Sequence, residues 1–189
     1  RTPAAALKPF VTVIAGPLIR VVGERFSSDV KSSILLALNK LFAKVPQFLR
    51  PFIPQLQRTF VKSLSDPSNE LLRSRAARAL GTLIEYQPRV DPLVMELLGG
   101  AKAATDIGVK TAMLKALLEV VDKAGTKMNE SSKNGVMELI EKEMFSGEVG
   151  VDTAVAYARL IGALSKILSD EEAIKMLKLK VFDIDLQDS

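Results

Sequence analysis

The chain has 189 residues, of which 48% are hydrophobic and 25% charged, so it can bury a substantial core and we do not expect disorder. It contains no Cys and no His, which excludes disulfides, Cys- or His-liganded zinc, a Cys nucleophile and a His general base. Because no paired-carboxylate motif, Gly-rich phosphate loop or Gly-x-Ser-x-Gly elbow appears, we expect a non-enzymatic protein without cofactor, metal or small-molecule substrate.

The net charge of +4 is unevenly distributed along the chain. Residues 1–90 contain 14 Lys and Arg against 5 Asp and Glu, a balance of +9, and residues 91–189 contain 12 against 17, a balance of −5. This asymmetry suits an acidic protein surface, ribosomal RNA or an acidic neighbouring repeat. The alternative is a set of solvated helix faces without a partner.

The beginning of the chain carries no export or membrane signal. The longest stretch without a charged residue lies between Lys8 and Arg20, well short of the roughly 20 apolar residues that cross a bilayer, so we expect no membrane contact. No secretory signal is present, and the chain starts at Arg1 rather than Met. We therefore expect a segment excised from a longer protein.

A proline-containing signature occurs three times in chain order. An apolar residue is followed by Pro two positions later, then by two large apolar residues and one further apolar residue, and the prolines are 42 and 41 residues apart. This pattern predicts the first helix of a repeated unit. The matching residues are Leu7, Pro9, Phe10, Val11 and Ile14; Leu49, Pro51, Phe52, Ile53 and Leu56; and Val90, Pro92, Leu93, Val94 and Leu97.

A second signature follows each of the first ones after roughly twenty residues. It consists of an aliphatic residue, a base and an Ala- and Leu-rich stripe, which predicts an amphipathic helix with a broad buried face. Within these stripes Leu38, Leu80 and Leu117 hold the same position, so we expect them to be buried equivalents. The candidate caps before the second helices are Ser28 or Asp29, Asn69, Asp106, and Glu148 or Gly150.

A two-helix unit of about 40 residues is typical of HEAT and armadillo repeats. We therefore expect an all-α fold, an α-solenoid of about four HEAT-type helical hairpins in one block. The units cover approximately residues 3–45, 46–87, 88–125 and 129–168, with a partial fifth helix at residues 170–181. A single hairpin cannot bury its apolar face alone, so the hairpins should stack around a continuous core.

One part of the sequence is more specific than the HEAT pattern requires. It resembles the C-terminal part of the giant HEAT-repeat translational activators of the general control non-derepressible one family, from about Leu7 to Val120, and beyond Gly125 the similarity fades. The residues that carry the resemblance are Leu7-Lys8-Pro9-Phe10-Val11, Gly16-Pro17-Leu18-Ile19-Arg20, Pro51-Phe52-Ile53-Pro54-Gln55-Leu56-Gln57 and Val90-Asp91-Pro92-Leu93.

The resemblance implies a function in translational control. Members of this family act on ribosomes in the cytoplasm and bind the RWD domain of the amino-acid-starvation kinase, which phosphorylates translation initiation factor two. Competing RWD proteins such as the inhibitor Impact would share the same surface. The Arg of the Gly-Pro-Leu-Ile-Arg motif is the family's main kinase-binding residue, and Arg20 holds that position here.

The position of Arg20 on its helix is a second reason, independent of the family, to expect it at a binding surface. Larger apolar residues including Phe10, Ile14 and Leu18 share one face of the first helix, whereas Arg20 falls on another face among small residues. We therefore expect an exposed Arg beside a bare patch of helix, although an ion pair with Glu24 at i+4 would make it structural. The candidate partner-binding residues are Thr12, Gly16, Arg20, Gly23, Glu24 and Arg25.

Other bases are weaker candidates for the same partner surface, namely Arg50, Arg58, Arg73, Arg75 and Arg78. The last three form a cluster in the sequence that could contact RNA, but the aromatic residues that stack on bases are not interleaved with them. A recurring base at Lys31, Arg73 and Lys110 is better explained as a ladder that bonds carbonyls of the preceding loop. The alternative functions are a generic HEAT adaptor and a scaffold that contacts ribosomal RNA.

Overall fold

The structure is a computed structural model that describes residues 3–23, 26–144 and 149–174. Within these residues every regular element is a helix, which confirms the all-α fold. The α-helices are α1 (Ala4–Leu7), α2 (Val11–Gly23), α3 (Ser28–Lys44), α4 (Pro46–Leu49), α5 (Ile53–Leu64), α6 (Glu70–Ile84), α7 (Asp91–Ala103), α8 (Ile107–Ala124), α9 (Glu130–Met144) and α10 (Val151–Ser165). Short 3-10 turns are η1 (Lys8–Phe10), η2 (Arg50–Phe52) and η3 (Gly125–Lys127).

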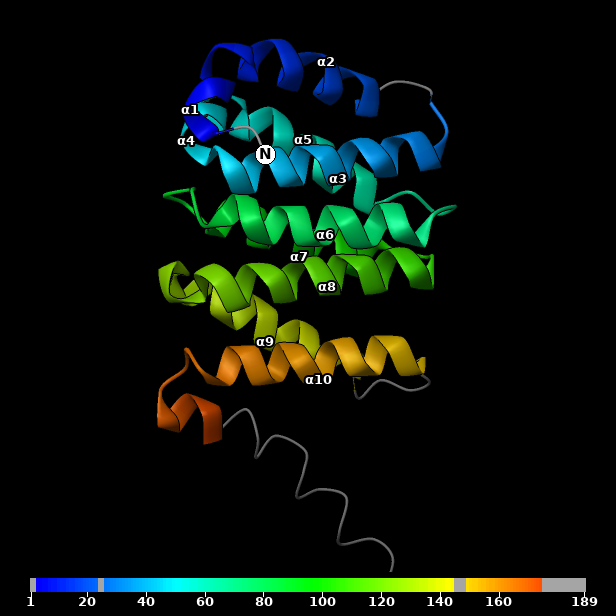
Figure 1. Ribbon diagram of the computed structural model, residues 1–189. Helices are drawn as coiled ribbons and strands as arrows, with labels where there is room; N and C mark the ends of the chain where they lie inside the picture. The colour runs from blue at the N-terminus through cyan, green and yellow to red at the C-terminus, as the bar shows by residue number, and fades with distance from the viewer. Residues whose placement is uncertain (1–2, 24–25, 145–148, 175–189) are drawn as a thin grey trace, which may run out of the picture.

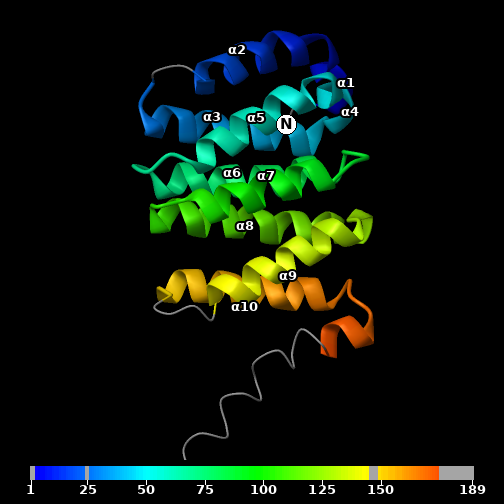
Figure 2. The same cartoon turned by 180° about the vertical axis from the view of Figure 1, so that it is seen from behind.

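The helices form two layers. One layer, here called the B layer, contains α3, α6, α8 and α10, which face the viewer in Figure 1. The other, the A layer, contains α5, α7 and α9, which face the viewer in Figure 2, with α2 packed on α3 and α5 at one end of the stack. The chain alternates between the layers, so it builds the stacked hairpins expected of an α-solenoid. Of the fifth helix expected at residues 170–181, only residues 170–174 are described, and they are helical.

Local sequence explains where the B-layer helices begin. The side chains of Asn69 and Asp106 accept hydrogen bonds of 2.8 Å from the N–H groups of Leu72 and Val109, as expected of N-caps. At α3 the cap is Ser27 rather than Ser28 or Asp29. Gly150 precedes α10 and supplies no side-chain cap, and Glu148 lies outside the described residues.

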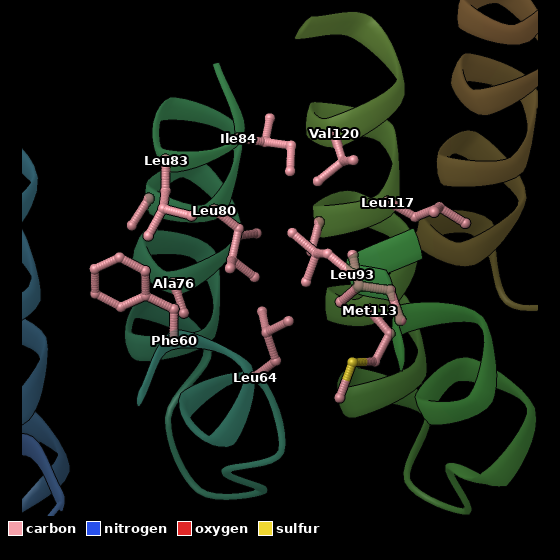
Figure 3. Packing of buried hydrophobic residues seen from close by; sticks show 14 of the residues in the cluster. Phe60, Leu64, Ala76, Leu80, Leu83, Ile84, Leu93, Met113, Leu117 and Val120 are labelled. Carbon is pink, nitrogen blue, oxygen red and sulfur yellow. The ribbon is translucent and has the colours of Figure 1, made fainter. Parts of the chain in front are cut away.

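The core runs through the stack as one cluster of aliphatic side chains. Leu38, Leu80 and Leu117 are 1%, 0% and 0% exposed, so their predicted equivalence is confirmed. Figure 3 shows how the clusters of successive hairpins join, since Ile84 of α6 and Val120 of α8 lie in the space between the two helices. No hairpin therefore has a core of its own.

Two B-layer helices approach closely at a glycine. A Cβ atom at Gly81 of α6 would lie 2.8 Å from both Cβ and Oε2 of Glu119 on α8, so only glycine fits there without movement of α8 or of the Glu119 side chain. Burial raises the pKa of Glu119 above its ordinary value, although the nearby charges of Arg78 and Lys123 oppose that rise. The contact places an acidic side chain at the seam between the second and third hairpins.

The buried face of α2 differs from the sequence-based expectation. The residues that pack into the core are Val11, Ala15, Ile19 and Val22, all at most 4% exposed. Phe10 and Ile14 are 57% and 38% exposed. Leu97 holds the position of Ile14 in the third hairpin and is fully buried. The second hairpin, formed by α5 and α6, precedes the third in the stack. No described helix covers that side of α2.

The expectation that no segment is long and apolar enough to cross a membrane needs correction. Within residues Ala4–Gly23, an 18-residue window has a mean hydropathy of 1.6, and only 22% of that window is buried. By length and composition alone this segment passes the test for a span. The structure divides this segment into α1, η1 and α2, and one face of α2 is buried in the core.

We predict that Leu38→Ala, Leu80→Ala and Leu117→Ala each lower the free energy of unfolding by about 2–5 kcal/mol, because each leaves a cavity in the shared core. The measurement is urea denaturation followed by circular dichroism. Leu71→Ala is the matched control, since Leu71 is 54% exposed and its truncation should have little effect. Near-neutral results at all three core positions would contradict the packing described here.

Candidate protein-binding surface

Arg20 is exposed in the last turn of α2. In helical projection it lies opposite the stripe formed by Val11, Ala15 and Ile19. No hydrogen bond or ion pair joins its guanidinium to another residue that the structure describes. The five donors of this side chain are therefore available to a partner.

The small residues next to Arg20 leave the helix backbone uncovered. Thr12 and Gly23 are exposed, and Gly16 is half-buried. Apart from its own chain neighbours and helix backbone, a Cβ atom at Gly16 or Gly23 would meet no described atom within 4 Å, so packing against other elements does not require either glycine. Gly16 directly precedes Pro17 inside the helix, and a proline ring disfavours helical conformation for a preceding residue that carries a Cβ atom. A glycine at position 16 therefore suits the local backbone, and it also leaves the helix surface bare beside Arg20.

The third hairpin has an open glycine at the same position as Gly16, so an open glycine alone does not indicate a binding site. Gly99 holds the position in α7 that Gly16 holds in α2, and a Cβ atom there would also meet nothing within 4 Å. Four residues beyond Gly99, however, stands Ala103 instead of an Arg. The combination of open glycine and unpaired cation therefore distinguishes α2 from α7.

The neighbouring A-layer helix extends the positive surface. Arg58 and Lys62 are both exposed on α5, four residues apart and thus on one face. Neither α2 nor α5 contains an Asp or Glu. Lys62 was not among the sequence-based candidates, although it stands 42 residues after Arg20 and so occupies the equivalent position of the next unit. The repeat spacing was the signal that could have found it.

Three candidates are not joined to this surface by the structure. Glu24 and Arg25 lie outside the described residues. Arg50 is exposed in η2, where it lines a cavity of about 620 Å³ with Glu85 and Tyr86. That cavity lies at the start of α5, whereas Lys62 and Arg20 are in the last turns of their helices.

Arg73, Arg75 and Arg78 do not form the cluster that their closeness in sequence suggested. Arg75 donates from Nη1 to Ser32 Oγ of α3 at 2.9 Å, toward the first hairpin. Arg73 lies on the other side of α6, against Gly108 of α8. Arg78 alone is exposed, and its charge acts on Glu119. The three guanidinium groups diverge because successive helical residues point about 100° apart.

The recurring base forms the predicted bond to the preceding loop in one unit. Arg73 Nη1 donates to the carbonyl oxygen of Asp66 at 2.7 Å, as the ladder hypothesis requires. Burial raises the pKa of Asp66, but hydrogen bonds from Ser68 and Ser28 outweigh it and hold that pKa below its ordinary value. Lys110 instead forms an ion pair with Glu143 Oε2 at 2.8 Å. The predicted bond to the preceding loop is therefore replaced at Lys110 by an ion pair between helices.

Comparison with known proteins tests the resemblance. Residues 91–189 match the family described as stalled ribosome sensor GCN1-like HEAT repeats. This chain belongs to that family. It is 69% identical over 186 residues to the eIF-2-alpha kinase activator GCN1 of Saccharomyces cerevisiae, covering 98% of the chain and 7% of that protein. It is 43% identical over 177 residues to the stalled ribosome sensor GCN1 of Homo sapiens, covering 94% of the chain and 6% of that protein.

A plant relative extends the comparison, since the protein ILITYHIA of Arabidopsis thaliana is 39% identical over 177 residues, covering 94% of the chain and 6% of that protein. The chain thus spans less than a tenth of the length of these GCN1-type relatives. No solved structure matches it. The family resemblance inferred from the Pro-Phe-Val and Gly-Pro-Leu-Ile-Arg motifs is confirmed, and it extends further along the chain than Val120.

We predict that Gly99→Ala raises the free energy of unfolding by about 0.5–1 kcal/mol, because Ala favours helix and the position is open. Gly16→Ala on α2 should stabilise less, because Pro17 disfavours helical conformation for a preceding residue with a Cβ atom. Urea denaturation of both variants measures the effect. Equal stabilisation by the two changes would show that Pro17 does not account for the glycine at position 16.

Proposed function

We propose that this chain is a non-catalytic scaffold that binds the RWD domain of the starvation-responsive kinase of translation initiation factor two through the exposed face of α2. One observation carries the proposal: Arg20 is exposed and unpaired among described residues, beside glycines that leave the helix surface bare. The similarity to a kinase activator and to a stalled ribosome sensor supports this class of function.

The charges on α2 and α5 favour an acidic partner. Arg20, Arg58 and Lys62 are exposed on these two helices, which contain no carboxylate of their own, so they attract an approaching acidic domain. The planar guanidinium of Arg20 can bind a carboxylate with two parallel hydrogen bonds. The glycines permit that carboxylate, or the backbone that carries it, to approach the helix closely.

This mode of binding has consequences for activation. The scaffold would hold the kinase's RWD domain on the ribosome in the cytoplasm, with ribosome contacts supplied by the longer chain, and so promote kinase activation on stalled or starved ribosomes. Competing RWD proteins such as Impact would occupy the same face of α2. Two RWD domains could not bind Arg20 at once, so competition requires no additional conformational change.

RNA binding receives less support from the described residues than an acidic protein partner does. The three arginines of α6 point to different neighbours, so they offer no continuous strip of cations for a phosphate backbone. A generic HEAT adaptor would instead bind through the B layer.

We predict that Arg20→Ala weakens binding of the isolated RWD domain by at least about thirtyfold while leaving the thermal transition unchanged, because a buried interfacial Arg contributes about 2–5 kcal/mol on truncation. Arg20→Lys should restore binding only in part, since the ammonium lacks the planar fork. Isothermal titration calorimetry measures affinity, and circular dichroism measures the transition.

Arg159→Ala is the matched control, because Arg159 is also an exposed helical Arg but lies on α10 in the other layer. It should bind the RWD domain like the unmodified chain. If Arg20→Ala also binds normally, or if it unfolds the protein, Arg20 is structural and the proposed site is wrong. Loss of binding in Gly16→Leu but not in Gly99→Leu would support close approach at the glycine.

A further inference from the structure

A second candidate site lies in the B layer, away from the exposed face of α2. A cavity of about 290 Å³ is formed where the first turns of α6, α8 and α10 lie side by side. Its lining includes the bases Arg73 and Lys115, the acids Glu70 and Asp152, and the aliphatic residues Ile107 and Val151. This volume approaches the lower end of the range for pockets that hold small ligands or peptide side chains.

Arg73 brings a buried charge to this cavity. The residue is only 8% exposed, its Nη1 donates to a backbone carbonyl, and its Nε has no hydrogen-bond partner. The carboxylate of Asp106 lies nearby, since a Cβ atom at Gly108 would be 2.6 Å from Arg73 Nη2 and 3.1 Å from Asp106 Oδ1, but no described carboxylate is within ion-pairing distance of Arg73. An anionic ligand that pairs with the guanidinium would reduce the cost of burying it.

Gly108 leaves room for the guanidinium of Arg73 at the cavity wall. A Cβ atom at Gly108 would lie 2.6 Å from Nη2 of Arg73, so the absence of a side chain lets the guanidinium lie against the first turn of α8. Both residues line the cavity. The Arg73 charge is therefore placed at the cavity wall by two helices together.

The start of α10 contributes a second feature that attracts anions. Asn69 and Asp106 cap α6 and α8, whereas no side chain caps α10 at Gly150. Gly150, Val151 and Thr153 line the cavity, so the first turn of α10, whose N–H groups have no acceptor within the helix, lies beside the same region as Arg73. A carboxylate could accept hydrogen bonds from these groups while pairing with the guanidinium.

The residues at the rim of the cavity indicate which groups would flank the carboxylate of a ligand. Ile107 and Val151 are 61% and 80% exposed, which is unusual for large aliphatic side chains that lie together at a cavity. Glu70 and Asp152 are exposed at the same rim, and their repulsion is greater for a polyanion such as RNA than for a ligand with one negative charge. A single carboxylate between aliphatic neighbours therefore fits this rim better than RNA does.

We infer that this B-layer cavity binds a protein segment in which one Asp or Glu side chain is flanked by aliphatic residues, with the carboxylate directed to Arg73 and to the start of α10. The site differs from the proposed RWD surface in layer and in residues. It could therefore hold a second partner while α2 is occupied.

The test uses the full 189-residue chain and two acetylated, amidated heptapeptides, Gly-Ser-Val-Glu-Leu-Ser-Gly and its Glu→Gln counterpart. Amide NMR titration of the isotopically labelled chain should show shifts at Gly108 and at Gly150 to Thr153. The Glu peptide should bind about tenfold more tightly than the Gln peptide, as expected for a charge-assisted hydrogen bond. Equal affinities, or shifts confined to α2, would overturn the proposal.

Variants separate the cavity from general electrostatics. Arg73→Met could loosen the loop at Asp66, so Lys115→Ala and Ile107→Ser are the primary variants, and each should weaken the Glu peptide several-fold. Lys40→Ala is the control, because Lys40 is exposed on α3 of the same layer and does not line the cavity. Equal weakening by Lys40→Ala, or tighter binding of poly(U) RNA than of the Glu peptide at these amides, would contradict a carboxylate site.

Discussion

A helical hairpin has two apolar stripes and can bury them only against another hairpin, and this constraint organises the rest of the structure. Leu80 and Leu117 are fully buried because α6 and α8 each have a B-layer neighbour on both sides. Where a neighbour is lacking, a repeat position that is otherwise buried is open: Ile14 of α2 is 38% exposed, whereas its equivalents Leu56 and Leu97 are at most 1% exposed. Burial in this chain is therefore decided by stacking as much as by residue type.

The same constraint leaves two kinds of surface for partners. Stacking uses the sides of each helix that face the next hairpin and the other layer, and it leaves the outward faces free. On α2 that free face holds Arg20 and open glycines, whereas the B layer holds a cavity around Arg73. Arg20 is exposed and pairs with no described residue, so we expect its removal to leave stability unchanged. Arg73 is 8% exposed and donates to the carbonyl oxygen of Asp66, so we expect its removal to lower stability.

The sequence predicted those features that depend on position within one helix or on the repeat spacing. Leu38, Leu80, Leu117 and the caps Asn69 and Asp106 are of this kind. It could not predict features that depend on two hairpins. The buried face of α2 is rotated toward Val11 and Ala15 because only α3 to α5 cover it, and Arg75 turns to Ser32 because α3 lies beside α6. The exposure of Arg20 was expected because it lies off the face of Phe10, Ile14 and Leu18, although the structure buries a different face of α2. The open space around Gly16 could be seen only in three dimensions.

The central claim is that the exposed face of α2 is the contact for the RWD domain. Amide hydrogen exchange of the chain with and without that domain tests it directly, because protection reports contact without any substitution that could disturb folding. The account predicts added protection in the second half of α2 and in the outward-facing part of α5, with α8 and α10 unchanged. Protection confined to the B-layer helices α6, α8 and α10, with α2 exchanging as in the free chain, would contradict it.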